Sequence, residues 1–166
     1  MNKILLLFLL VTSFCFSQNM TTEKLNLLIT KQADSVAVNG NSWNFMYKGK
    51  LLICIADTNA NRMRIISPIA PQKELSKELI LNSLVANFHT ALDVKYAISD
   101  NVLWSVFTHP LKELSTHQVK DAISQVYFAN ATFGSLYSST SLSFPASKRP
   151  KEEQEPKKER ELIQKI

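Results

Sequence analysis

Runs of strand-forming residues, joined by short turns, are the feature that most constrains the fold of this chain. Residues 42–47 read Ser-Trp-Asn-Phe-Met-Tyr and place three aromatic side chains on one face of a strand. A Lys-Gly-Lys turn follows, and residues 51–56 are apolar on both faces, which is typical of a central strand. Two strands joined by so tight a turn pair antiparallel. The sequence therefore predicts an antiparallel sheet.

Three further strands are predicted, which makes five. Residues 62–67 form the third strand, and we expect it to end at Pro68. Its two arginines make one of its faces polar, so an edge position is predicted. The last two strands, 93–99 and 102–108, flank a short turn of serine, aspartate and asparagine.

Helical spacing of apolar residues predicts three helices. The first begins at Thr21 and continues to Val36, before an Asn-Gly stop signal. The second covers residues 75–90, and its apolar stripe consists of Leu81, Leu84, Val85 and Phe88.

The third helix has the clearest start signal of the chain. Ser115 and Gln118 fit a capping box, and Leu114 and Val119 are spaced for a hydrophobic staple. The predicted order is thus α-β-β-β-α-β-β-α. This order describes an α+β domain over residues 20–137, with a five-stranded antiparallel sheet and helices packed on one side.

Both ends of the chain read differently from the domain. Residues 1–17 combine a lysine, an apolar run and a small residue, which predicts a cleaved signal peptide and export to the periplasm or outside. The apolar run is shorter than the ~20 residues that a membrane span needs, so no transmembrane segment is expected after cleavage. Lipidation at Cys15 is disfavoured because the bulky Phe14 precedes it. Residues 138–166 are rich in serine, then in charge, and are predicted to be a disordered tail.

The net charge of +5 does not indicate a nucleic-acid-binding protein. From Lys148 onward the tail carries seven cations and five glutamates, and the domain itself has nearly balanced, scattered charges. A surface that follows phosphates needs clustered Lys and Arg. After signal removal Cys54 is the one cysteine left, so an internal disulfide is excluded and a buried thiol is predicted.

No catalytic, metal or cofactor residues can be assigned. The three histidines (His89, His109 and His117) are not at metal-ligand spacing with each other or with a cysteine or carboxylate. There is no nucleophile elbow, phosphate-binding loop or dinucleotide fingerprint. We therefore predict a protein without enzymatic activity and without a cofactor.

The aromatic row Trp43, Phe45 and Tyr47 is the sequence's candidate for a protein-binding or dimer patch, if the row is exposed. The alternative is that the row forms part of the core. Alternation along one strand does not decide between the two faces of a sheet.

The order of elements resembles the YbjN and type III secretion chaperone-like family. The resemblance is carried by Trp43 to Pro68, by Leu84 to His89 and by Tyr96 to Trp104, and it covers about residues 22–137. It implies a five-stranded antiparallel sheet backed by helices, and a non-enzymatic protein that binds other proteins, often as a dimer. The predicted signal peptide sets this chain apart from secretion chaperones of this fold, which act in the cytoplasm.

These observations predict an exported protein-binding domain, chaperone-like or regulatory, whose partner protein is unknown and which forms a homodimer. Two alternatives stay open. One is an envelope protein that binds a small molecule or lipid between sheet and helices, and the other is a hydrolase with a cryptic site.

Overall fold

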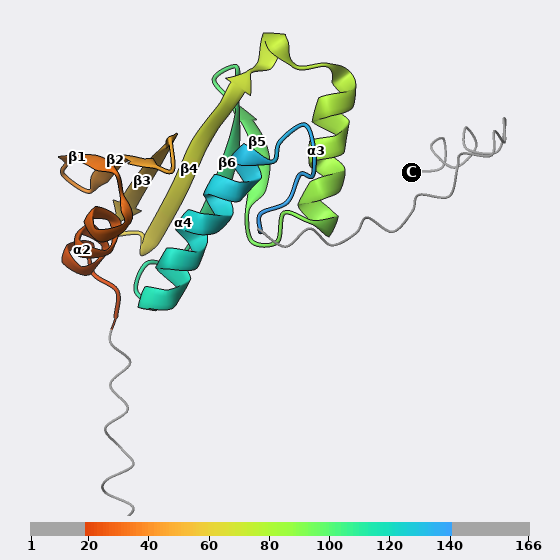
Figure 1. Ribbon diagram of the computed structural model, residues 1–166. Helices are drawn as coiled ribbons and strands as arrows, with labels where there is room; N and C mark the ends of the chain where they lie inside the picture. The colour runs from red at the N-terminus through yellow and green to blue at the C-terminus, as the bar shows by residue number, and fades with distance from the viewer. Residues whose placement is uncertain (1–18, 141–166) are drawn as a thin grey trace, which may run out of the picture.

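A computed structural model of the chain describes residues 19–140 (Figure 1). The predicted signal peptide and residues 141–166 lie outside these residues. The elements, labelled as in Figure 1, are α2 (Thr22–Gln32), β1 (Ser35–Asn39), β2 (Ser42–Tyr47), β3 (Lys50–Asp57), β4 (Arg62–Pro71), the short 3-10 helix η1 (Gln72–Glu74), α3 (Lys77–His89), β5 (Lys95–Ser99), β6 (Val102–His109) and α4 (Thr116–Ala131).

The fold is the predicted α+β arrangement with one strand more than expected. Six strands form a single antiparallel sheet in the order β1-β2-β3-β4-β6-β5. Helices α2 and α4 cover one face of the sheet, and α3 lies beside the edge strand β5 (Figure 1). None of the helices in residues 19–140 is long and apolar enough to cross a membrane.

The sixth strand arises where the sequence predicted the end of the first helix. Helix α2 ends at Gln32, and Val36 lies in β1, opposite Phe45 of β2. Val36 and Val38 fit helical spacing, but β-branched residues also suit a strand. Pairing with β2 makes these residues a strand rather than a continuation of α2. In the strand, Val36 packs against the core.

Strand β4 is central, so the predicted edge position is wrong. It lies between β3 and β6, and it continues past Pro68 to Pro71. A shift of register between Pro68 and Ala70 allows the strand to continue, since a proline lacks the N–H of a regular ladder. Arg62 and Arg64 are exposed on the face of the sheet that α2 and α4 leave open.

The core fills the space between the sheet and the helices α2 and α4. Its largest fully buried side chains come from both layers: Trp43, Phe45, Leu25, Ile29, Leu52, Met63, Ile65, Leu103, Leu114, Ile123, Val94 and Val119. The predicted start of α4 is confirmed: Ser115 Oγ accepts from the Gln118 N–H at 3.2 Å, and Gln118 Oε1 accepts from the Ser115 N–H at 2.8 Å.

A buried polar chain ties α4 to the middle of the sheet. Asn130 is 6% exposed, and its Nδ2 donates to Ser67 Oγ and to the Pro68 carbonyl, both at 2.7 Å. The Ser67 hydroxyl in turn donates to the Leu51 carbonyl at 2.7 Å. These bonds fix the C-terminal end of α4 over β3 and β4.

The outer edge of β5 is occupied by a side chain of α3. Asn87 Oδ1 accepts from the Tyr96 N–H at 2.7 Å, and Asn87 Nδ2 donates to the Tyr96 carbonyl at 3.1 Å. The Asn87 carboxamide thus bonds both the N–H and the carbonyl of Tyr96, the two groups with which a further strand would pair at this residue. The same contact holds α3 beside the sheet.

The domain continues beyond residue 137, where the predicted tail begins. Ser138 and Ser139 are 7% and 1% exposed. The Thr90 hydroxyl donates to the Tyr137 carbonyl at 2.6 Å, and the Ser139 N–H donates to the Thr90 carbonyl at 3.3 Å. Tyr137 and Ser139 are therefore bound to the C-terminal end of α3, and the predicted tail beyond Thr140 lies outside the described residues.

Candidate protein-binding surfaces

The predicted aromatic row is divided between the core and the surface. Trp43 and Phe45 are 2% and 1% exposed, and Trp43 Nε1 donates to Asn26 Oδ1 of α2 at 2.9 Å. For these two residues the core alternative holds, because a partner at the surface cannot reach side chains that α2 covers. They are therefore removed from the candidate binding surface.

Tyr47 remains within reach of a partner. Its ring meets Tyr127 of α4 edge to face at 5.5 Å, and the Lys48 ammonium lies 5.2 Å from the Tyr47 ring and 5.4 Å from the Tyr127 ring. Phe128 completes this cluster. The sequence showed Tyr47 as a candidate, but Tyr127 and Phe128 come from a helix 80 residues away, and no local pattern joins them to the strand.

The most prominent apolar surface is the outward face of α3. Its predicted stripe, Leu81, Leu84, Val85 and Phe88, is 50%, 56%, 53% and 87% exposed. We call these four residues the α3 stripe. Contiguous exposed apolar residues of this size usually mark an interaction site in a protein.

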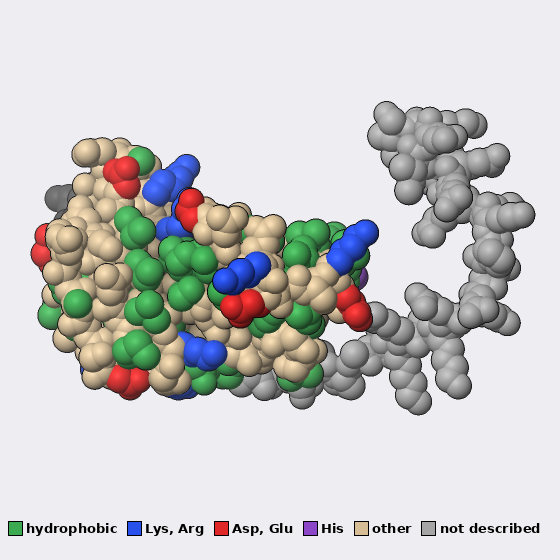
Figure 2. Space-filling view, turned by 90° about the horizontal axis from the view of Figure 1, so that it is seen from above, with side chains coloured by type: hydrophobic (Ala, Val, Ile, Leu, Met, Phe, Trp, Pro, Cys, Tyr) green, Lys and Arg blue, Asp and Glu red, His purple; other side chains and the backbone are tan. Residues whose placement is uncertain are grey.

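The helix packs on the sheet with its small residues instead. Ser83 and Ala86 are the buried residues of α3, and Asn87 holds the helix to β5. Because the contact with the sheet uses short side chains, every large apolar side chain of the stripe is left at the surface. Figure 2 shows hydrophobic side chains at the right-hand end of the molecule, where α3 lies, next to charged ones.

A second apolar surface lies on the side of the sheet that none of the helices in residues 19–140 covers. Leu51 and Ile55 are 40% and 45% exposed there. The strand register brings further half-buried apolar side chains beside them. We call this surface the open sheet face; its apolar members are Met46, Leu51, Ile53, Ile55, Ile66, Pro68, Trp104 and Val106.

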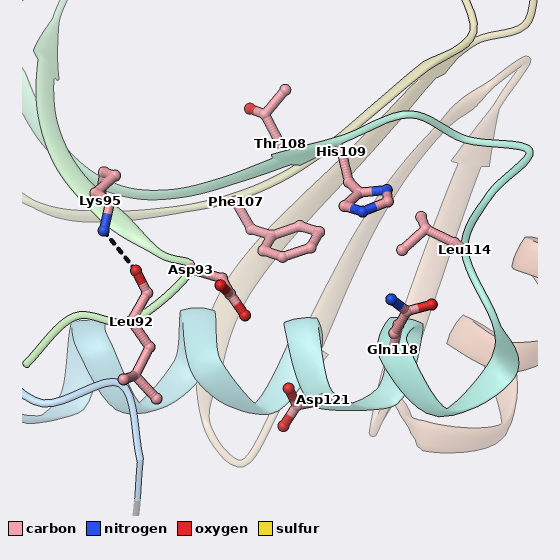
Figure 3. A pocket seen from close by; sticks show the side chains of 9 residues that line it. All are labelled: Leu92, Asp93, Lys95, Phe107, Thr108, His109, Leu114, Gln118 and Asp121. Carbon is pink, nitrogen blue, oxygen red and sulfur yellow. Dashed lines mark hydrogen bonds between the residues drawn. The ribbon is translucent and has the colours of Figure 1, made fainter.

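A hollow of about 420 Å³ lies between the end of β6 and α4 (Figure 3). Gln125 Nε2 donates to Asp93 at 3.2 Å and to Asp121 at 2.7 Å, and His109 Nδ1 lies 2.8 Å from the Pro110 carbonyl. Neither carboxylate is bonded to His109, and no serine or cysteine lines the hollow. The residues that line it form no nucleophile–base pair.

The three histidines come from three separate elements. His89 ends α3 and contacts the Phe88 ring at 4.9 Å, His109 ends β6, and His117 is in the first turn of α4. Within residues 19–140 no three His, Cys, Asp or Glu side chains could together hold a metal ion. Cys54 is buried as predicted, and burial raises the pKa of its thiol to about 12.

Comparison with known proteins finds similarity in structure and none in sequence. No family model matches the chain, and no curated protein matches it by sequence. The Yersinia pestis type III secretion chaperone SycH, solved in complex with a stable fragment of YscM2, superposes with a TM-score of 0.52 at 10% identity. That match covers 68% of this chain and 99% of the SycH structure's chain.

A second match comes from the structure of the HopA1–SchA chaperone–effector complex, with a TM-score of 0.49 at 13% identity. It covers 65% of this chain and 94% of the other. At these identities the likeness concerns the fold alone. On the evidence of the SycH match, the chain has the fold of the type III secretion chaperones.

Proposed function

We propose that this chain is an exported, non-enzymatic protein-binding domain that pairs with a second copy of itself through the α3 stripe. The observation that carries the proposal is the exposure of four large apolar side chains on one helix face. The chaperone-like fold supports a protein-binding role, because SycH was solved together with a protein fragment.

The spacing of the α3 stripe favours a second copy over an unrelated partner. Two such helices, crossed antiparallel about a two-fold axis between Leu84 and Val85, bring Leu84 of each copy against Val85 of the other. The same axis brings Leu81 against Phe88, so a large residue of each copy meets an apolar residue of its partner. A two-fold interface needs such a self-complementary surface.

The alternative of an envelope protein that binds a small apolar ligand has less support. Six of the nine residues that line the hollow between β6 and α4 are charged or polar, among them Asp93, Lys95 and Asp121. A site for an apolar ligand is lined mainly by hydrophobic side chains. The space between sheet and helices is filled by the core residues.

Export is proposed from residues 1–17 alone. Expression in a bacterium with an intact secretion pathway is expected to yield a protein that begins at Gln18. Mass spectrometry of the intact protein measures this directly, and a protein that retains residues 1–17 would contradict export by cleavage.

The pairing is tested by placing a charge in the centre of the α3 stripe. Leu84→Glu puts two carboxylates close to the two-fold axis, where burial makes unpaired charges costly. We expect the dimer dissociation constant to rise roughly 100-fold or more. Sedimentation equilibrium of the chain from Gln18 measures it, and circular dichroism verifies that the variant is folded.

Leu27→Glu is the matched control. Leu27 lies on α2 and is 69% exposed, so the substitution adds the same charge to another helix. This control is expected to leave the dimer intact. Equal dissociation by both variants rules out pairing through α3.

A further inference from the structure

The described part of the chain ends next to the α3 stripe. The hydrogen bonds of Thr90 to Tyr137 and Ser139 hold residues 137–139 against the C-terminal end of α3. Phe88, the most exposed member of the stripe, precedes Thr90 by two residues. The chain therefore leaves the domain at one end of the largest exposed apolar helix face.

The residues that follow have an apolar pattern of their own. Residues 141–146 read Ser-Leu-Ser-Phe-Pro-Ala, and the first four of them alternate polar and apolar side chains. In an extended chain Leu142 and Phe144 are about 6.8 Å apart. On a helix, Phe88 and Leu84 are about 6 Å apart along the axis. Two successive apolar residues of the segment thus match two successive turns of the stripe.

The segment is also long enough to cover the stripe. From Leu81 to Phe88 the stripe extends over seven residue steps, or about 10 Å of helix. Six extended residues reach about 20 Å. If Leu142 lies at Phe88, Phe144 reaches Leu84 and Val85, and Ala146 comes near Leu81.

Two buried hydroxyl groups close to the exit point lack a partner in residues 19–140. They are Tyr137 Oη and Ser139 Oγ. Buried polar groups in native proteins are nearly always hydrogen-bonded. Both hydroxyls are therefore available to polar groups that come close to this end of α3.

We infer that residues 141–146 bind the α3 stripe of their own chain and compete there with the second copy. This inference concerns regulation and rests on the proposed function. A tethered segment acts at an effective concentration of the order of millimolar, so even weak contacts of Leu142 and Phe144 reduce pairing. Anything that draws the segment away makes the stripe available.

The first test traps the segment on α3 with a disulfide. Leu81→Cys with Ala146→Cys leaves Phe88, Leu142 and Phe144 in place, and the protonated, buried Cys54 does not interfere. In dilute solution we expect an intramolecular disulfide to form at least about tenfold faster than when Leu142→Ser and Phe144→Ser are added. The tether is identical in both proteins, so only docking separates the two rates. Non-reducing gels and intact mass identify the product.

The second test measures pairing of the full chain from Gln18. Leu142→Ser with Phe144→Ser is expected to tighten the dimer about tenfold or more, because the competitor is lost. Equal trapping rates with and without the serine substitutions overturn the inference, as does a predominantly intermolecular disulfide. If trapping succeeds but no variant dimerises, the segment does bind α3, and it is the proposed pairing that fails.

Discussion

Replacing Trp43 with alanine is expected to lower the free energy of unfolding by about 3–5 kcal/mol. The indole is 2% exposed, lies opposite Cys54 of β3, and donates its N–H to Asn26 of α2. Alanine leaves a cavity beneath α2 and an unpaired carboxamide oxygen. Since domains of this size are typically stable by only about 5–15 kcal/mol, the variant is expected to be largely or partly unfolded.

Urea unfolding followed by far-UV circular dichroism measures the effect independently of tryptophan fluorescence. Trp104→Ala is the control, because Trp104 lies on the open sheet face. Its indole N–H donates to the Ser99 carbonyl at 3.1 Å. We expect Trp104→Ala to cost less than half as much as Trp43→Ala. Equal costs, or a folded Trp43→Ala variant that loses only its dimer, would restore Trp43 to the binding surface.

Removal of the Asn130 side chain is expected to cost about 2–3 kcal/mol. Asn130→Ala takes away two donated hydrogen bonds of 2.7 Å and leaves the carbonyl of the half-buried Pro68 without the amide that reaches it from α4. The loss is large for a polar residue because water cannot replace the amide at a site that is 6% exposed.

A double-mutant cycle with Ser67→Ala separates the shared bond from the rest. Because Asn130 donates directly to Ser67, the two substitutions are expected to be non-additive by about 0.5 kcal/mol or more. Strictly additive losses in urea unfolding would show that the two residues stabilise the domain independently. The exposed Asn44→Ala on β2 is a control for loss of an asparagine side chain at the surface.

Patterns within one element predicted most of the fold correctly. The alternation in 42–47, the apolar run that follows it and the capping box at Ser115 each depend on neighbouring residues, and all three are present. The missed strand β1 and the misplaced β4 depend on pairing between elements. Val36 suits either a helix or a strand, and only its pairing with Phe45 distinguishes them.

The candidate surfaces were harder to predict for the same reason. Helical spacing groups Leu81, Leu84, Val85 and Phe88 on one face, but it does not say whether the sheet or solvent meets that face. The signal that could have resolved this is on the opposite side of α3, where Ser83 and Ala86 are small enough to approach a strand closely. Trp43 and Phe45 show the converse, since their burial depends on α2, which lies elsewhere in the sequence.

The side chain of Asn87 has a consequence for how this protein behaves at high concentration. A sheet with two free edges can be extended without limit, because the last strand of one molecule can pair with the first strand of the next and build a filament. Among the strands of residues 19–140, β5 has both outer backbone groups of Tyr96 bonded to the carboxamide of Asn87, whereas the other edge strand, β1, has no such block. When two molecules pair through their β1 strands, both unblocked edges are buried in the contact. Growth by edge pairing therefore ends at a dimer.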